Sequence, residues 1–475
     1  MNENLSIESI REYARQTEMH KKIRDKFLRE FKAAGAESNS VLFLKGGEEV
    51  TLWDTDNCYS FRQESFFFYL FGVEDPDCVG MLEVDSGKVH LFVPRLDKNL
   101  ALYLVLPTPE LIASKYGYEA HYIDELASVL SSTSPSKIYL NKGKNTDSGS
   151  STVSYFYSEA FSAYSVDENL LYPSLAEARV IKTPEEIEVL KRMSLSGSEA
   201  HVRLMQSCKP GMMEYQLPAA FHSFLANLGL THSFPPISAS GNNGSTLHYP
   251  DNSKRMNESE LVICDMGSYG YGYCSDITCT LPVSGVFSEK QRGIYELVLK
   301  ANREVTKAMR PGVNWTDMHL LAERIILEGL KELGLVQGDV DQMIEKRVGG
   351  VFMPHGLGHF LGMDVHDVGG YVKGPEKIDK LGLRNLRTRR DLEENMVITV
   401  EPGCYFIDFA IDEALQNPET QNFLVKEKID EYRGFGGVRL EDDVLVTSEG
   451  AVVLNDVPRT PEQVQAAMQG ANWKS

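Results

Sequence analysis

The pattern of apolar and polar residues predicts an α/β arrangement for the first part of the chain. Apolar residues recur at helical spacing from Ser6 to Gly35, which predicts one amphipathic helix. Three strand-like runs follow: SVLFL, ESFFFYLFGV and VGMLEVDSGKVHLFVP. The last run predicts a β-hairpin, because Asp85-Ser86-Gly87 is a turn sequence between two apolar stretches. We therefore expect a mixed α/β domain over residues 1–178.

A strong helix-start signal marks the end of this domain. In VIKTPEEIEVL, Thr183 fits the N-cap and Pro184 the first helical position, and a glutamate follows at the third. We place the domain border just before this signal, so that a second domain covers residues 179–475. Two further helix starts are predicted there, at Ser288 (with Gln291 completing a capping box) and at Thr316.

The segment LVICDMGSYGYGYCSDITCTLPV, residues 261–283, combines two β-rich runs with a glycine-tyrosine turn. If the turn centres on Gly270-Tyr271, Asp265 and Asp276 are directly opposed, with Cβ atoms about 4.5–5.5 Å apart. Opposed carboxylates destabilise a hairpin unless a cation neutralises them, so the pattern favours a divalent metal. A polar hairpin with two solvated aspartates remains the alternative. A phosphate-binding loop is disfavoured, because no helix pattern follows the glycines.

Two further carboxylates lie on strand-like segments of the same domain. ENMVITVEPGCY predicts a short buried strand that ends at Glu401, where a charge is costly without a partner. In RGFGGVRLEDDVLVT, strand alternation places Arg439, Glu441 and Asp443 on one face. Each carboxylate alone is compatible with a half-exposed strand. Together with the two aspartates, they favour a shared cation.

Three of the 11 histidines, His355, His359 and His366, lie within FMPHGLGHFLGMDVHDVGG, residues 352–370. Clustered imidazoles indicate metal binding, proton transfer or substrate recognition. The first two histidines have the spacing of an HExxH zinc helix, but Gly356 replaces the required glutamate and the glycines disfavour a helix. A zinc helix of that type is therefore excluded. The sequence also lacks a G-x-S-x-G elbow, a P-loop and a kinase signature.

Composition narrows the classes of protein that fit. A chain of 475 residues is too long for one core, which agrees with two domains. A net charge of −20 argues against a general nucleic-acid binder. No run of about 18 apolar residues and no secretory signal is found, so we expect no membrane association and a cytoplasmic location. Seven cysteines without a CxxC pair disfavour a disulfide framework.

The sequence resembles the metallopeptidases of the pita-bread fold and, within them, the Xaa-Pro dipeptidases. The resemblance covers nearly the whole chain and is densest in FMPHGLGHFLGMDVHDVGGY, NLRTRR, VEPGCYFID and RGFGGVRLEDDV. Five residues match the family's metal ligands in order and context: Asp265, Asp276, His359, Glu401 and Glu441. The implied fold class is α/β (α+β), with an N-terminal creatinase/prolidase-type α/β domain and a pita-bread catalytic domain built on a curved sheet.

The resemblance implies two divalent metal ions. Four carboxylates and one imidazole form an oxygen-rich set, which favours Mn²⁺, with Zn²⁺ and Co²⁺ as alternatives. By similarity, Asp276 binds one ion, Asp265 and Glu441 bridge both, and His359 and Glu401 complete the other. A hydroxide that bridges the metals would cleave the bond before proline, with Glu401 as proton shuttle.

Further site residues follow from the resemblance. It implies that His248, His355 and His366 line the substrate wall, with His248 and His366 close to the developing charge. Arg439 is expected behind Glu441, and Thr278 behind Asp276. Arg387 matches the arginine that receives the C-terminal carboxylate of an Xaa-Pro dipeptide, which would explain a preference for dipeptides. Two alternatives remain: an aminopeptidase P that acts on longer Xaa-Pro peptides, and a non-catalytic pita-bread binding module.

Two positions depart from the family pattern. Tyr103 stands where related dipeptidases often carry a tryptophan that reaches the partner subunit's active site, and it is included among the predicted substrate contacts. Phe234 stands where a tyrosine is usual near the metal site. The resemblance also implies a homodimer.

Overall fold

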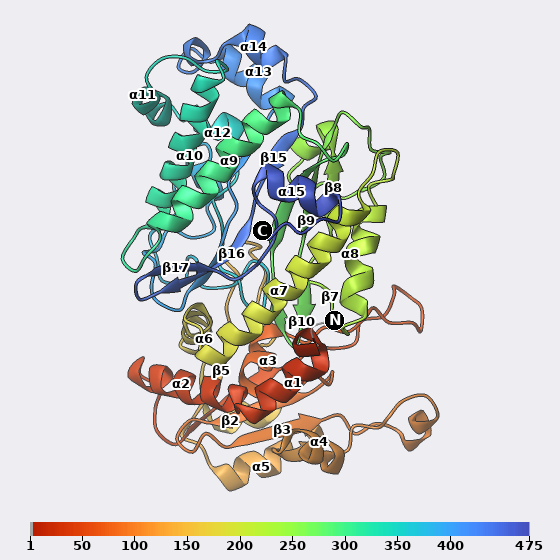
Figure 1. Cartoon of the computed structure of the whole chain (residues 1–475). Coiled ribbons are helices and arrows are strands. Elements are labelled where there is room, and N and C mark those ends of the chain that lie inside the picture. Colours follow the sequence, from red (N-terminus) through yellow and green to blue (C-terminus); the bar gives the residue numbers. More distant parts are fainter. Residues whose placement is uncertain (1–2, 475) are drawn as a thin grey trace. The chain divides into compact units, whose positions relative to one another are not determined.

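The computed structural model describes residues 3–474 and divides into two compact units (Figure 1). The amino-terminal unit comprises Ala14–Thr183. The carboxy-terminal unit comprises the residues up to Tyr13 together with those from Pro184 onward. The border predicted from the sequence, at residues 178–179, lies within the last turn of α6 (Leu171–Val180). The next helix, α7 (Pro184–Ser207), begins at Pro184 as its start signal predicts.

The amino-terminal unit is built on a six-stranded mixed sheet with strand order β4-β3-β2-β1-β5-β6. Strands β1, β2 and β3 are antiparallel, whereas β4, β5 and β6 join in parallel. The hairpin predicted around Asp85-Ser86-Gly87 is confirmed as β2 and β3. The strands are β1 (Ser40–Lys45), β2 (Val79–Glu83), β3 (Val89–Val93), β4 (Glu119–Tyr122), β5 (Lys137–Leu140) and β6 (Ser165–Asp167).

Helices cover both faces of this sheet, as Figure 1 shows. Phe31 of α2 (Met19–Ala33) packs on Tyr139 of β5. The opposite face carries a core that includes Phe43 and Phe92 from the strands and Leu130 from α5 (Leu126–Thr133). The unit also contains α3 (Ser65–Phe71) and α4 (Pro109–Tyr116).

Two sequence predictions for this part of the chain are wrong. The single helix expected from Ser6 to Gly35 is two helices, α1 (Ile7–Gln16) and α2, because Glu18 adopts a left-handed conformation with φ 50°. The strand expected in ESFFFYLFGV is helix α3, in which every residue after Ser65 is buried. A helix that is apolar on all sides shows no periodicity, so its sequence cannot be distinguished from a buried strand.

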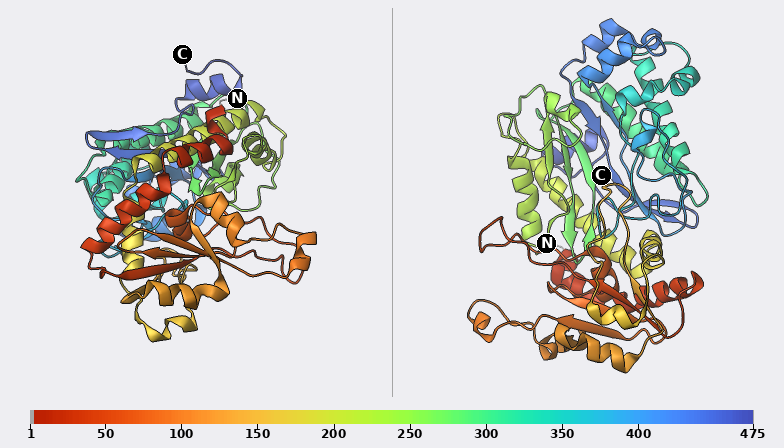
Figure 2. Two further views of the ribbon diagram at one scale, coloured as in Figure 1. Left: turned by 90° about the horizontal axis from the view of Figure 1, so that it is seen from below. Right: turned by 180° about the vertical axis from the view of Figure 1, so that it is seen from behind.

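The carboxy-terminal unit consists of small antiparallel sheets and long helices. Helix α7 packs on β10, β11 and β12, and α9 (Glu289–Ala308) packs on β13, β14, β15 and β17, so the long helices lie on one side of the strands (Figures 1 and 2). The strands are β7 (Thr231–His232), β8 (Ile237–Ser240), β9 (Leu261–Met266), β10 (Ser268–Gly270), β11 (Tyr273–Cys274), β12 (Ile277–Pro282), β13 (Val397–Val400), β14 (Gly403–Tyr405), β15 (Gly437–Arg439), β16 (Asp442–Thr447) and β17 (Gly450–Val453).

The helices of this unit test the predicted start signals. The remaining ones are α8 (Gln216–Ala226), α9 (Glu289–Ala308), α10 (Trp315–Glu332), α11 (Val340–Glu345), α12 (Gly349–Phe352), α13 (Asp408–Gln416), α14 (Lys426–Asp430) and α15 (Pro461–Met468). The capping box of Ser288 and Gln291 is confirmed. The predicted cap at Thr316 is wrong, because Asn314 accepts the hydrogen bond from the Thr316 amide and the helix begins two residues earlier than predicted.

The hairpin that carries the two aspartates has a different register from the predicted one. Asp265 pairs with Thr278, and Gly270 pairs with Tyr273, so the turn centres on Tyr271-Gly272. Both turn residues have positive φ, 48° and 77°, as in the type I′ turns that match strand twist. Asp265 and Asp276 are therefore diagonal neighbours on one face, not directly opposed.

No helix within residues 3–474 is long and apolar enough to cross a membrane. The seven cysteines are free thiols, and six of them are buried.

Candidate metal centre

The five predicted metal ligands come from four parts of the carboxy-terminal unit. Asp265 lies near the end of β9, Asp276 directly precedes β12, His359 follows α12, Glu401 follows β13 and Glu441 lies between β15 and β16. Donor atoms of Asp276, His359 and Glu441 all lie within 4.8 Å of one another. We call the five residues the buried cluster, since Asp265, Asp276, His359 and Glu441 are buried and Glu401 is half-buried.

The backbone holds His359 beside Glu401. Residues 357–361 run antiparallel to residues 397–401: the Glu401 amide donates to the Leu357 carbonyl at 2.9 Å, and the Thr399 amide donates to the His359 carbonyl at 2.9 Å. A Cβ atom on Gly358 would lie 1.9 Å from the Thr399 carbonyl oxygen, so only glycine permits this approach. His359 and Glu401 then point to the same side of the ladder.

A second set of contacts brings Glu441 to the aspartate hairpin. Its backbone amide donates to the Thr278 carbonyl at 3.1 Å, and the Thr278 hydroxyl donates to its carboxylate at 2.7 Å. Asp443, two residues further on, accepts from the Asp276 amide at 3.1 Å and from the Ser194 hydroxyl at 2.6 Å. Asp443 therefore positions the backbone of Asp276.

Burial and mutual repulsion make the carboxylates hard to ionise without a cation. Burial, followed by the negative charges of neighbouring carboxylates, raises the pKa of Asp276 and of Glu441 well above the ordinary values. Burial also raises the pKa of Glu401 to about 7, against the lowering effect of Arg439. Carboxylates in such an environment are stabilised by metal coordination.

The donor set fits divalent cations. Asp265 and Asp276 each have a buried Oδ1 atom with no hydrogen-bond partner among residues 3–474. The Nδ1–H of His359 donates to the Phe360 carbonyl at 3.0 Å, which leaves the Nε2 lone pair facing Asp276 and Glu401 at 3.4 and 3.5 Å. Burial lowers the pKa of His359 to about 4, so the ring is neutral and able to act as a ligand.

Arg439, Tyr405 and His355 form a chain of contacts that ends at Asp265, one of the predicted metal ligands. Arg439 donates to Asp265 at 2.7 Å and to the Tyr405 hydroxyl at 2.9 Å. The Tyr405 hydroxyl also lies 2.9 Å from His355 Nε2. The Nδ1–H of His355 donates to the Gly356 carbonyl, so Nε2 accepts the tyrosine hydrogen. Burial and Arg439 lower the pKa of His355 to about 3.

The partners of Arg439 and Thr278 differ from the predicted ones. The sequence placed Arg439 behind Glu441 and Thr278 behind Asp276. In the structure Arg439 binds Asp265, and Thr278 binds Glu441. The corrected hairpin register explains the different partner of Thr278. In this register Thr278 is paired with Asp265, and its hydroxyl donates to Glu441.

The other predicted substrate residues lie around this cluster. The ring of His366 packs edge-to-face on that of His359, with centroids 4.5 Å apart. Arg387 is half-buried, and its charge lowers the pKa of His366, His248 and Glu401, which places all four groups in one electrostatic neighbourhood. The side chain of His248 is exposed.

The structure also places the two residues at which the sequence departs from the family pattern. Tyr103 belongs to the amino-terminal unit, where it follows the short 3-10 helix η2 (Lys98–Leu102), and its side chain is 84% exposed. Phe234 is half-buried between β7 and β8.

Sequence reasoning did not assign roles to three residues that hold the cluster in place: Tyr405, Asp443 and Thr399. Thr399 accepts from the His359 amide at 3.1 Å, and its hydroxyl lies 3.4 Å from Glu401. Its position two residues before Glu401 on a strand was a usable signal, because both side chains then share one face. Tyr405 gave no such signal, since its partners are distant in sequence.

Comparison with known proteins agrees with this geometry. The model of "Metallopeptidase family M24" matches residues 188–448, and that of "Aminopeptidase P, N-terminal domain" matches residues 20–139. The human Xaa-Pro dipeptidase is 45% identical over 449 residues, which cover 93% of this chain and 91% of the relative. A probable Xaa-Pro aminopeptidase of Sordaria macrospora is 34% identical, over 91% of this chain and 92% of the relative.

Solved structures of similar proteins include two bacterial aminopeptidases. Zinc-substituted aminopeptidase P of Escherichia coli in complex with product has a TM-score of 0.76 and 31% identity, and covers 94% of this chain and 99% of its own. Pseudomonas aeruginosa aminopeptidase PepP has the same TM-score at 29% identity, over 94% of this chain and 98% of its own. The predicted α/β fold class is confirmed. The chain therefore belongs to metallopeptidase family M24, with a domain of the aminopeptidase P amino-terminal type preceding the metallopeptidase domain.

Proposed function

We propose that the chain is a metal-dependent Xaa-Pro dipeptidase. The observation that carries the proposal is the buried cluster, in which carboxylates of raised pKa lie beside a neutral imidazole. Two of its aspartates also have an oxygen atom with no hydrogen-bond partner among residues 3–474. Relatives named Xaa-Pro dipeptidase at about 45% identity over nearly the whole chain support the substrate class.

We expect the cluster to bind two ions, with Mn²⁺ preferred over Zn²⁺ and Co²⁺. All five side chains would serve as ligands: Asp265, Asp276, His359, Glu401 and Glu441. Four carboxylates balance the charge of two dications, and oxygen donors outnumber the single nitrogen donor, which suits Mn²⁺. When bound, the ions supply a water activated at neutral pH and polarise the scissile carbonyl.

The protein's own groups complete the reaction. Glu401, with a pKa of about 7 in the metal-free protein, is the best placed carboxylate to move a proton to the departing proline nitrogen. His366 and His248 have lowered pKa values, so both imidazoles are neutral and present hydrogen-bond donors to the oxygen that gains charge. Arg439 holds Asp265 in orientation through a buried ion pair.

Arg387 is proposed to select dipeptides. Its positive charge lies close to His366, His248 and Glu401, where the C-terminal carboxylate of a bound dipeptide would lie. A longer peptide places a neutral amide at that position and leaves the arginine without its anionic partner, which costs binding energy.

We further propose a homodimer and a cytoplasmic location. Three large side chains that are close in sequence, Leu102, Tyr103 and Val105, are each more than 80% exposed. Such an exposed apolar group is typical of a protein–protein contact, and we expect the partner to be a second copy of the chain. Light scattering of the purified protein tests the dimer.

A second candidate is an aminopeptidase P activity on longer peptides. The fungal relatives and the bacterial structures carry that name and share the fold. This activity differs from that of the first candidate in that the substrate's C-terminal carboxylate is not recognised next to the proline. Arg387 would then have a different role.

Release of proline from Gly-Pro and of arginine from Arg-Pro-Pro separates the candidates. The protein is stripped of metal with a chelator and then assayed before and after addition of Mn²⁺. Metal-dependent cleavage of the dipeptide alone supports the dipeptidase. Cleavage of the tripeptide assigns an aminopeptidase P instead, and a failure to cleave either substrate contradicts both proposals.

A further inference from the structure

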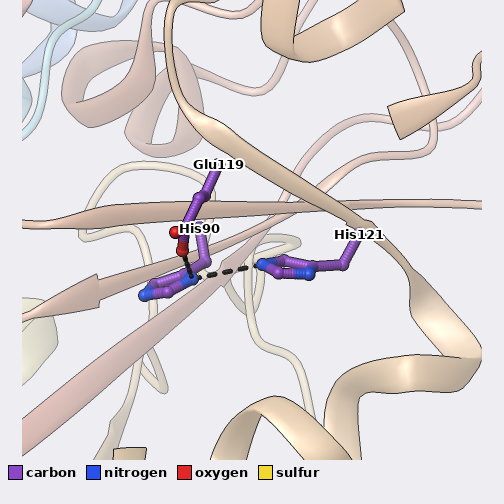
Figure 3. Close-up of side chains that lie close together, drawn as sticks. All are labelled: His90, Glu119 and His121. Carbon is purple, nitrogen blue, oxygen red and sulfur yellow. Dashed lines mark hydrogen bonds and ion pairs between the residues drawn. The ribbon is translucent and has the colours of Figure 1, made fainter. Parts of the chain in front are cut away.

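A second group of potential metal ligands lies in the amino-terminal unit, at the edge of the six-stranded sheet. We call His90, Glu119 and His121 the sheet-edge cluster (Figure 3). The Nδ1 atom of His90 lies 3.1 Å from Glu119 Oε2 and 3.3 Å from His121 Nε2. The three side chains point toward one another from β3 and from the edge strand β4 (Figure 3).

The strand register explains this convergence. His90 is paired directly with Glu119 across the parallel strands, and His121 lies two residues beyond Glu119, so all three side chains share one face. His90 is buried, His121 is half-buried and Glu119 is exposed. The cluster therefore extends from a buried position on β3 to a solvent-exposed position on the edge strand β4.

Hydrogen bonding orients the donor atoms. Glu83, on β2, accepts from the Nε2–H of His90 at 3.0 Å, which leaves the lone pair of Nδ1 directed at Glu119 and His121. A carboxylate that holds the far nitrogen of an imidazole is the usual support of a histidine metal ligand. His90 Nδ1 lies close to both Glu119 Oε2 and His121 Nε2. A single hydrogen shared among these three atoms serves one pair well, whereas a cation binds all three.

The only cation recorded beside the cluster within residues 3–474 is that of Lys88, whose Nζ lies 2.8 Å from Glu119 Oε2. Both side chains of this pair are about half exposed, and within the described residues the lysine forms no hydrogen bond or ion pair with either imidazole. It therefore balances the charge of the carboxylate and would compete with a metal for one ligand only.

We propose that the sheet-edge cluster binds Zn²⁺ through His90 Nδ1, His121 Nε2 and Glu119, with Glu83 as the residue that positions His90. Two imidazoles and one carboxylate, with a water in the fourth position, form a common zinc ligand set. It is richer in nitrogen than the buried cluster and so selects a different metal. A bound ion ties the short edge strand β4 to β3, which gives the site a structural role.

The test counts zinc in the full-length protein after catalytic metals have been excluded. Asp276→Ala with His359→Ala disables the buried cluster and serves as the background. This protein is loaded with Zn²⁺, desalted and analysed for metal by mass spectrometry. The proposal predicts one zinc per chain in the background. It predicts none after the further change His121→Gln, and none after Glu119→Gln, which provides a second variant if the first folds poorly.

Two further variants distinguish a specific zinc site from adventitious zinc binding. Glu83→Gln should weaken zinc affinity by about 10- to 100-fold, because it loosens the orientation of His90. Lys88→Met should keep the zinc and bind it more tightly, since it removes the competitor for Glu119. Cobalt loaded in place of zinc should give visible absorption bands in the background protein and lose them in His121→Gln.

The proposal is overturned if the background protein retains no zinc, or if it retains the same amount when His121 or Glu119 is changed. Neither result bears on the dipeptidase activity, which is measured separately with the buried cluster intact.

Discussion

The buried cluster and the sheet-edge cluster differ in how their carboxylates are stabilised in the ionised form. The buried cluster gathers four carboxylates and one imidazole, and burial raises the pKa of Asp276, Glu441 and Glu401. In the sheet-edge cluster the pKa of Glu119 is lowered, chiefly by a hydrogen bond from Lys88. The pKa of Glu83 is lowered by Ser86 and His90 against the opposing effect of burial.

This contrast indicates that the buried cluster needs a bound cation more than the sheet-edge cluster does. Without ions, the buried cluster retains repulsion between carboxylates that water does not screen. The sheet-edge cluster is already balanced by a lysine and by solvent, so it is stable when empty. The first cluster has therefore been assembled at a cost in stability, as expected for a functional site, whereas the second is tolerated with or without an ion.

The largest expected effect is that of removing a buried ligand. Asp276→Asn should reduce kcat/KM for Gly-Pro by at least about 1,000-fold, because the charge stabilisation that the ions supply is lost. The matched variant at the sheet edge, His121→Gln, should leave the rate within about twofold, since metal there has no catalytic role. Equal losses in the two variants, measured by steady-state proline release, would remove the distinction between the clusters.

Removal of the proposed carboxylate receptor should be next in size. Arg387→Ala should raise KM for Gly-Pro by about 10- to 100-fold, the range for loss of a hydrogen bond to a charged group. It should also reduce the preference for the dipeptide over Arg-Pro-Pro. Arg384→Ala is the control, because Arg384 lies on the same segment and is exposed. An unchanged KM in Arg387→Ala would show that another group binds the carboxylate.

The free energy of unfolding of the metal-free protein tests whether the carboxylates of the buried cluster destabilise the fold. The folded-state pKa of Glu441 is raised, so its burial destabilises the metal-free protein as pH rises above about 4.5, the ordinary glutamate value. Glu441→Gln should therefore stabilise the metal-free protein by about 1–3 kcal/mol at about pH 7.5, with the gain vanishing toward about pH 4.5.

The sheet-edge residue should behave in the opposite way. The folded-state pKa of Glu119 is lowered, so its contribution is present at neutral pH and is lost on acidification. Glu119→Gln should thus give no stabilisation at about pH 7.5. Urea unfolding in the presence of chelator measures both variants. A destabilised Glu441→Gln protein would contradict the account of the buried cluster.

The smallest effect is expected from the residue that supports the cluster at a distance. Tyr405→Phe removes the hydroxyl that is hydrogen-bonded to both Arg439 and His355. It should lower kcat/KM by only about 2- to 10-fold, because neither bond is made to the substrate. Metal content should be unchanged, because Arg439 keeps its bond to Asp265. Loss of metal in this variant would instead make Tyr405 part of the ion-binding structure.

Much of the fold and most of the site could be predicted because their signals are local. The capping box at Ser288, the β2–β3 hairpin and the strand that precedes Glu401 each depend on residues within a short window. The buried helix α3 could not be predicted in this way, since uniform burial removes the periodicity that distinguishes a helix from a strand.

The errors at the site arose where partners are distant in sequence. One residue of turn register decided whether Asp265 faces Asp276 or Thr278, and the positive φ of Tyr271 is not evident from the sequence. The partners of Arg439 lie 34 and 174 residues away, so no local pattern indicates them. The sheet-edge cluster was not predicted for the same reason, as β3 and β4 are joined by a helical excursion.

The central claim is that activity requires both ions of the buried cluster. Metal-free protein with His121→Gln, which leaves only the buried cluster, is titrated with Mn²⁺ while bound metal and Gly-Pro hydrolysis are followed together. The account predicts two Mn²⁺ per chain at saturation and full activity only as the second ion binds. Full activity with one ion bound, or activity that persists in excess chelator, would contradict it.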